Sequence, residues 1–212
     1  MGIFSDFLFA KAIKRIDSDD PALNPIYLTF DDGPTQHSTN KILDLLDEEK
    51  VKASFFCIAN KVLETPSLFN EIVSAGHSIG NHSLDHTFHN FFLGKRKMFN
   101  WINGSEQVFS KILNKPTVGF RSPAGIITPE LIWALKELKL PLIHWSVRFF
   151  DTRRLWTEKK ALCAVDHLKR GDIILLHDVH RQNTDHFTNT LGIFIKAAKD
   201  KGFSFLPISG NP

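Results

Sequence analysis

Short apolar runs rich in β-branched and aromatic residues alternate along the chain with longer stretches whose apolar residues recur at helical spacing. The short runs predict strands at residues 26–30, 53–59, 78–81, 117–121, 142–147, 172–177 and 203–208. The longer stretches predict helices at residues 39–49, 67–75, 99–113, 129–138, 158–169 and 188–199. This alternation is typical of parallel strands joined by crossover helices, so we expect an α/β fold. Six or seven units favour a barrel, with a flat doubly wound sheet as the alternative.

The N-terminal segment carries its own apolar pattern. Apolar residues fall on one face at helical spacing at Ile3, Phe4, Phe7, Leu8, Ala12, Ile13 and Ile16. We expect a helix within residues 1–20 that packs on the domain, with contact at a membrane surface as the less favoured alternative. Asp6 and Lys11 interrupt the apolar stretch, which argues against a secretory signal and for a cytoplasmic protein. Residues 21–212 are then expected to form a single domain.

Composition narrows the classes of function. Hydrophobic residues make up 42% and charged residues 23%, which is typical of a globular chain. The net charge of +3 is spread over scattered basic residues, so no nucleic-acid partner is expected. The two cysteines, Cys57 and Cys163, predict neither a disulfide framework nor a cysteine-ligated zinc. The oligomeric state is left open.

Polar and ionisable residues follow five of the predicted strands. These groups are Asp31-Asp32-Gly33-Pro34, the segment 81–86, the segment 121–125, Asp151, and His177-Asp178. The carboxyl ends of parallel strands meet at one rim, where α/β folds place their functional residues. We therefore expect these side chains to share one site.

Asp32, His82 and His86 are the candidate metal ligands. The two histidines are four residues apart, a spacing that places two ligands on one helical turn, although a surface pair has the same spacing. Adjacent carboxylates repel each other unless a cation lies nearby, so we expect Asp32 to bind it and Asp31 to remain a free base. One carboxylate and two imidazoles leave coordination positions open, which is typical of a catalytic metal. Zinc suits these ligands, and cobalt or another divalent ion fits as well.

Asp31, Arg121 and His177 supply the acid–base chemistry beside that metal. A bound divalent ion lowers the pKa of water and polarises a carbonyl. Asp31 is placed to take the proton of the water, Arg121 to keep Asp31 ionised, and His177 to protonate a leaving nitrogen or oxygen. Arg121 alone also fits a surface ion pair, and His177 alone fits a core residue. Their conjunction predicts a hydrolase of an amide or an ester.

These motifs resemble those of the NodB-homology polysaccharide deacetylases, carbohydrate esterase family 4, over residues 26–208. The resemblance implies a distorted (β/α) barrel, usually of seven units. It also implies that Asp31 is the general base and that Asp32, His82 and His86 hold the metal. Residues 53–56, Ala-Ser-Phe-Phe, resemble the strand between these motifs.

The later motifs carry the rest of the implied site. The run Arg121-Ser122-Pro123-Ala124-Gly125 is similar to the motif that flanks the substrate groove and anchors the base. Leu175 and His177 match a motif whose leucine lines the acetyl pocket and whose histidine is the general acid. Asp151 matches a carboxylate that orients the catalytic histidine or arginine.

The chain departs from the family pattern at three groove positions. Ala124 stands where an aromatic residue is usual, and Arg148 and Thr152 replace an aspartate and a tryptophan. The catalytic residues are thus retained while the groove walls differ. Trp145 and Trp156 are candidates for replacing the lost aromatic surface.

The resemblance implies a metal-dependent hydrolase that removes N-acetyl groups from an N-acetylhexosamine glycan of the chitooligosaccharide or peptidoglycan type. One alternative is a deformylase or O-acetyl esterase acting on a precursor or lipid-linked sugar, which the arginines near residue 150 would suit. A catalytically inactive glycan-binding protein is a further alternative, but it usually lacks a base, an acid or a ligand.

Overall fold

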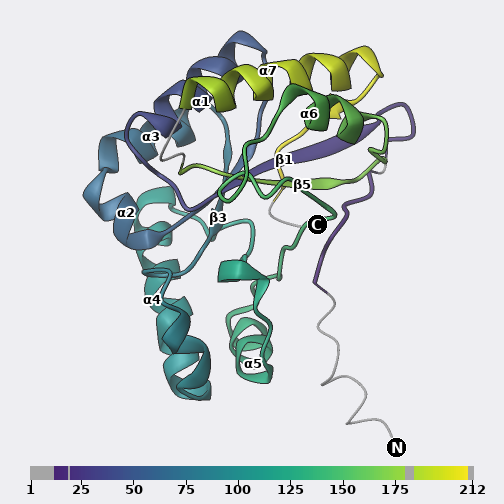
Figure 1. The fold of residues 1–212 in the computed structure, drawn as a ribbon. Helices are drawn as coiled ribbons and strands as arrows, with labels where there is room; N and C mark the ends of the chain where they lie inside the picture. The colour runs from purple at the N-terminus through teal and green to yellow at the C-terminus, as the bar shows by residue number, and fades with distance from the viewer. Residues whose placement is uncertain (1–11, 19, 180–183, 210–212) are drawn as a thin grey trace, which may run out of the picture.

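The computed structural model describes residues 12–18, 20–179 and 184–209, and it has the predicted α/β architecture (Figure 1). The strands are β1 Pro25–Asp31, β2 Ser54–Cys57, β3 Ser78–Asn81, β4 Val147–Arg148, β5 Ile173–His177 and β6 Ser204–Phe205. The helices are α1 Ser38–Glu48, α2 Ala59–Glu64, α3 Pro66–Ser74, α4 Lys95–Leu113, α5 Pro129–Leu138, α6 Glu158–Val165 and α7 Thr184–Asp200. Two 3-10 turns cover Phe88–Phe92 and Pro123–Gly125.

The sheet is parallel, with β1 near its centre. Its order is β3-β2-β1-β5-β4, and β6 also pairs with β1. Helices α1, α6 and α7 cover one side of the strands, while α4 and α5 lie next to each other on the opposite side (Figure 1). The α/β class is therefore confirmed.

Two predicted strands, 117–121 and 142–147, are present only in part. Phe120 forms isolated bridges to Asn81 and to Leu142, and regular pairing resumes only at Val147, which pairs with β5. Proline has no N–H to give to a ladder, and Pro116 and Pro141 precede these two segments. The described residues form a six-stranded sheet where about seven strands were predicted, and these bridges continue the pairing beyond β3 through Phe120 to Leu142.

The alternation of β1 separates the core from the site. Ile26, Leu28 and Phe30 belong to the large apolar cluster beneath the helices. Tyr27 points to the opposite face, into a smaller cluster. Because successive side chains of a strand face opposite sides, Thr29 and Asp31 share the face of Tyr27.

Most predicted helices are confirmed with shifted ends. The 129–138 helix was predicted with its observed bounds, and its N-cap Thr128 accepts a hydrogen bond from the Leu131 N–H at 3.2 Å. The predicted 53–59 strand is too long, because β2 ends at Cys57 and Ala59 begins α2. The apolar residues continue from the strand into the helix, so the sequence pattern does not mark the boundary between them. The predicted 158–169 helix ends earlier, at Val165.

The predicted N-terminal helix is wrong for residues 12–18, which contain no helix and form two isolated bridges. Ile13 forms a parallel bridge with Ile143, and Arg15 forms an antiparallel bridge with Asp172. The Arg15 side chain also donates to Asp172 at 2.7 Å. Pairing with neighbouring segments satisfies the backbone groups that a helix would have paired internally. The rest of the predicted helix, residues 1–11, lies outside the described part of the chain.

Candidate catalytic and metal site

Asp31 lies at the carboxyl end of β1, where a buried arginine holds it. One Arg121 nitrogen, Nη1, donates to Asp31 Oδ1 at 2.8 Å and to Thr29 Oγ1 at 2.7 Å. Both acceptors are on the same face of β1, two residues apart, so a single guanidinium reaches both. The carboxylate is thereby fixed in orientation and kept next to a positive charge.

Arg121 is itself fully buried and held on several sides. Its Nε donates to the Ile143 carbonyl at 3.3 Å, and its Nη2 donates to the His144 carbonyl at 3.0 Å. The guanidinium also lies 3.9 Å from the centroid of the Phe56 ring. Burial lowers the pKa of Arg121, and the charge of Asp31 opposes this change. Arg121 is therefore a rigid cationic support behind Asp31.

The three predicted metal ligands come together in front of this pair. Asp32 Oδ1 lies 3.3 Å from Nε2 of both His82 and His86. One ligand atom from each of the three residues falls within 4.8 Å of the others. This spacing is compatible with one ion between them, since ligand atoms about 2 Å from zinc lie roughly 3–4 Å apart.

The hydrogen bonds of His82 show that this cluster fits a cation. His82 Nδ1 lies 2.9 Å from the Arg121 carbonyl oxygen, which only accepts, so Nδ1 carries the proton and Nε2 presents its lone pair to Asp32. Asp32 Oδ1 is buried and accepts no hydrogen bond from the described residues. Lone pairs that face one another in this way repel unless a cation lies between them. The residues present therefore fit a divalent ion.

The protonation states agree with metal binding. Burial raises the pKa of Asp32, but the hydrogen bond and charge that His82 would supply in its protonated form, with the charge of a protonated His86, outweigh it and hold the pKa well below its usual range. Burial, helped by the neighbouring His82, lowers the pKa of His86. At neutral pH Asp32 is thus ionised and His86 is neutral, which are the forms that bind metals.

His82 and His86 are not on a helical turn, so that part of the prediction was wrong. They lie on a loop after β3 in which Ser83 has φ 80° and His86 has φ 60°. The loop is fixed by hydrogen bonds from the Ser83 N–H to Asn81 Oδ1 at 2.8 Å and from the His86 N–H to Ser83 Oγ at 3.0 Å. The short polar side chains favour this backbone shape and bring both rings to Asp32.

His177 stands on the other side of Asp31. The two residues are direct partners in the parallel register of β1 and β5. His177 Nδ1 lies 2.9 Å from Asp151 Oδ1, and the His177 N–H donates to Asp151 Oδ2 at 2.9 Å. Burial lowers the pKa of His177, but the Asp151 hydrogen bond and charge, with Asp31 and Asp32, raise it to about 8. His177 is therefore protonated at neutral pH in the metal-free protein.

A cleft of about 260 Å³ joins these groups. Of the predicted residues it is lined by Asp31, Asp32, His82, His86, Ala124, Asp151, Leu175 and His177. The lining also includes Ser122, Trp145, Arg148, Phe150, Thr152 and Arg153. Sequence reasoning did not identify Ser122 or Phe150. In the sequence, the only indication that these two residues line the site is that Ser122 follows Arg121 and Phe150 precedes Asp151.

The two candidate tryptophans have different places. Trp145 lines the cleft, whereas Trp156 is buried and packs on Phe149 and Phe194. Gly125 has φ 71°, and a Cβ there would lie 2.8 Å from Trp145 Cη2. Gly125 thus leaves room for the Trp145 wall, and Pro123 is buried beside it rather than lining the cleft.

Two charged residues to which the sequence analysis assigned no role support the loop after β1. Lys61 Nζ on α2 donates to the Asp32 carbonyl at 2.7 Å. Asp178, fully buried, accepts a hydrogen bond from Thr39 Oγ1, and burial raises the pKa of Asp178 to about 7. The Asp178 N–H also donates to the Asp31 carbonyl at 2.7 Å. These contacts hold the ligand and the base at the sheet edge.

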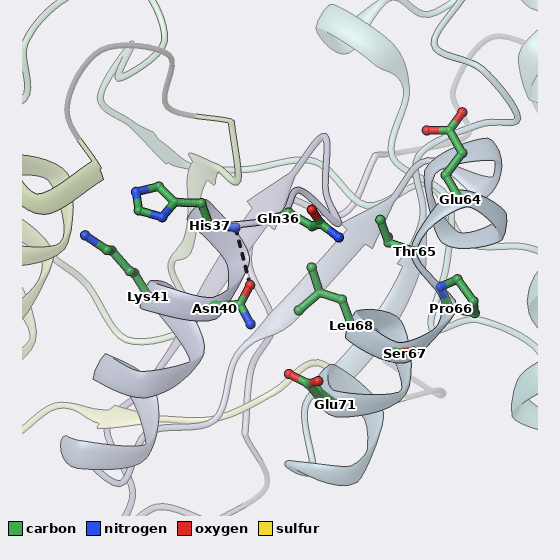
Figure 2. Close-up of a pocket in the computed structure, with 10 residues that line it drawn as sticks. All are labelled: Gln36, His37, Asn40, Lys41, Glu64, Thr65, Pro66, Ser67, Leu68 and Glu71. Carbon is green, nitrogen blue, oxygen red and sulfur yellow. Dashed lines mark hydrogen bonds between the residues drawn. The ribbon is translucent and has the colours of Figure 1, made fainter.

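A second hollow, of about 650 Å³, lies between the start of α1 and the junction of α2 with α3. Figure 2 shows that its wall includes His37 and Lys41 on one side and Glu64 and Glu71 on the other. It is larger than the cleft but contains none of the predicted site residues. The convergent ionisable groups therefore identify the smaller cleft as the candidate site.

Comparison with known proteins supports the family. The family model described as polysaccharide deacetylase matches residues 19–143, and the chain belongs to this family. A peptidoglycan-N-acetylglucosamine deacetylase of Bacillus cereus is 31% identical over 188 residues, which cover 87% of this chain and 86% of the relative. A chitooligosaccharide deacetylase of Bradyrhizobium sp. (strain ANU 289) is 27% identical over 214 residues, covering 96% and 98%.

A solved structure supports the fold. The crystal structure of a peptidoglycan N-acetylglucosamine deacetylase in complex with a naphthalenyl N-oxidanyl-benzamide matches with a TM-score of 0.79 and 28% identity, covering 88% of this chain and 86% of that one. No helix in the described ranges is long and apolar enough to cross a membrane.

Proposed function

We propose that the protein is a metal-dependent hydrolase that removes N-acetyl groups from a glycan containing N-acetylhexosamine. One observation carries the proposal: the ligand cluster Asp32, His82 and His86 shares a cleft with a carboxylate, Asp31, and a protonated histidine, His177. Such a pair supplies a base and an acid on either side of a scissile amide. The named activities of the relatives and the family match support the same reaction.

Asp32, His82 and His86 would hold the ion, with zinc the proposed metal and cobalt a fitting alternative. When bound, it supplies Lewis-acid polarisation of the carbonyl and an acidified water. Asp31, which accepts a hydrogen bond from Arg121, takes the proton from the water. His177 gives its Nε2 proton to the leaving amine, while Asp151 keeps the proton on Nδ1 and orients the ring.

The cleft walls are proposed to position the acyl group. Leu175 lies on β5 two residues before His177, lines the cleft and is largely buried, so it can pack against a methyl group. The backbone at Ala124, which has φ 52°, borders the same cleft and is the proposed source of an N–H for the oxyanion. Pro123 and Gly125 set the course of this backbone.

Release of free acid from acylated sugars tests the proposal. The metal-replete protein is incubated with N-acetylated chitooligosaccharides, peptidoglycan fragments, acetylated xylan and nucleotide-linked aminosugars, and acetate and formate are measured separately. Acetate from an N-acetylated glycan is expected. Release of formate alone, or acetate from xylan alone, would replace the N-acetyl assignment with deformylase or esterase activity. Glycan binding without turnover would indicate the non-catalytic alternative.

A further inference from the structure

An arginine stacked on an exposed aromatic ring forms one wall of the cleft. The guanidinium carbon of Arg148 lies 3.7 Å from the centroid of the Phe150 ring. Phe150 is 44% exposed, and both residues line the cleft. Stacking on a ring occupies the face of the guanidinium, while its N–H donors lie in the plane and remain free. The stacked pair therefore offers donors to whatever enters the cleft.

The positive charge of this wall is not neutralised within the part of the chain that the structure describes. There, no carboxylate lies within ion-pair distance of Arg148 or of Arg153, the second arginine on this wall. The nearby carboxylate of Asp151 is already hydrogen-bonded to His177 through both oxygens. The two arginines thus add an unpaired cationic wall beside the acid–base site.

A tight turn holds this wall in place. Phe150 has φ 57°, a conformation that is unfavourable for a bulky residue. Its carbonyl accepts hydrogen bonds from the N–H groups of Arg153 at 2.9 Å and Arg154 at 3.0 Å. Asp151 ties the same turn to His177. An unfavourable backbone conformation at a residue that lines the cleft is typical of a functional site.

We propose that this cleft recognises an anionic substituent, a carboxylate or a phosphate, on the acylated sugar. Arg148 is the main donor, pre-positioned by Phe150, and Arg153 adds a second positive charge. A planar guanidinium pairs with either group through two parallel hydrogen bonds. The inference rests on the proposed deacetylase function and specifies its substrate class.

Three matched substrates test the inference on the metal-replete full chain. They are a trimer of N-acetylglucosamine, the same trimer with a lactyl ether carrying a carboxylate, and the same trimer with a 1-phosphate. The wild type is expected to have a KM at least about tenfold lower for one anionic trimer than for the neutral one, as a charge-assisted bidentate pair allows. The preferred anion distinguishes a carboxylate from a phosphate.

The variants are Arg148→Gln and Arg153→Gln, with Arg154→Gln as the control, since Arg154 belongs to the same turn but does not line the cleft. Arg148→Gln is expected to raise KM for the preferred anionic trimer about tenfold more than it raises KM for the neutral trimer. Arg153→Gln should have a smaller effect in the same direction. Arg148→Lys should recover only part of the loss, because lysine lacks the planar fork.

Binding measured separately distinguishes the two proposals. Calorimetry with the catalytically impaired Asp31→Asn protein reports affinity for the three trimers without turnover. Equal affinity for all three, or anion preference that survives Arg148→Gln, would overturn this inference even if acetate is released. Anion binding that depends on Arg148, with no acid released by the metal-replete wild type, would support the inference and overturn the proposed function.

Discussion

Gly33 lies directly against the buried carboxylate of Asp178. A Cβ added to Gly33 would lie 2.2 Å from Asp178 Oδ2, which is closer than atoms can approach, and 3.0 Å from its Cγ. The same oxygen already accepts a hydrogen bond from Thr39. The loop that carries Asp32 can therefore reach its place only because residue 33 has no side chain.

Gly33→Ala should displace that loop. We expect weaker metal binding, loss of most acetate release, and a decrease of about 1–3 kcal/mol in the free energy of unfolding, as is typical of overpacking. Gly104→Ala is the control, because its added Cβ would meet only Leu84 Cδ2, at 4.0 Å, in the middle of α4. That change should be neutral or stabilising. Wild-type metal affinity in Gly33→Ala would contradict the steric argument.

Asp31→Asn should retain the fold and the metal but lose activity. Asparagine has nearly the same shape and can still accept from Arg121 Nη1, yet it cannot take a proton from water. We expect acetate release to fall about 10²–10⁴-fold, the usual contribution of a general base. Metal content and the melting temperature serve as controls. Activity within a few fold of the wild type would remove Asp31 from the role of base.

His82→Ala and His86→Ala should each lower metal affinity. We expect a larger loss for His82, whose ring is buried and held by the Arg121 carbonyl, than for the partly exposed His86. His89→Ala is the matched control, since it is an exposed histidine on the same segment. Competition with a chromogenic chelator measures each affinity. Normal zinc affinity in His82→Ala would disprove the ligand assignment.

The stability of the metal-free protein should depend on the titration of His177. Its pKa in the folded state is about 8 against 6.5 in the unfolded chain, so folding favours the protonated form. The contribution, about 2 kcal/mol, is fully present below pH 6.5 and disappears as the pH rises through about 8. Urea unfolding across this range, with an NMR titration of the His177 ring, measures it. A ring that titrates near or below pH 6.5 would contradict the prediction.

Asp151→Asn should weaken this pH dependence. The Asp151 charge opposes the effect of burial on the pKa of His177, so its loss should lower that pKa. The decline in activity at high pH should then begin at a lower pH, because the general acid deprotonates earlier. Asp166→Asn is the control, as this exposed residue pairs with Lys201 away from the site. An unchanged NMR titration of His177 in Asp151→Asn would refute the proposed coupling.

The chemical groups of the candidate site were predictable from the sequence because of strand polarity. Asp31, Asp32 and the histidine pair follow predicted apolar strands, and Arg121 and His177 are the last residues of two others. In parallel strands the carboxyl ends lie at one edge, whatever the details of the pairing. The register between Asp31 and His177 confirms this for β1 and β5. The α/β class rests on the same alternation of strand and helix.

The local backbone was harder to predict, because each case depends on distant partners. The 117–121 and 142–147 segments have strand composition, yet only isolated bridges form between them. Residues 12–18 have helical spacing, but their backbone groups bond to the segment around Ile143. Local propensity is worth tenths of a kcal/mol per residue, so tertiary pairing overrides it.

By itself, then, the sequence determined which ionisable residues the rim would carry and in what order along the chain. Only the tertiary structure decided which aromatic residue faces the cleft: Trp145 lines it, whereas Trp156 is buried against Phe149. It also decided that Arg148 stacks on Phe150 at the mouth of the site. The order of residues along the chain fixes which end of each strand carries the polar groups. The direction of a side chain in a loop that lines the cleft depends on backbone dihedral angles and packing, which the hydrophobic pattern of the sequence does not predict.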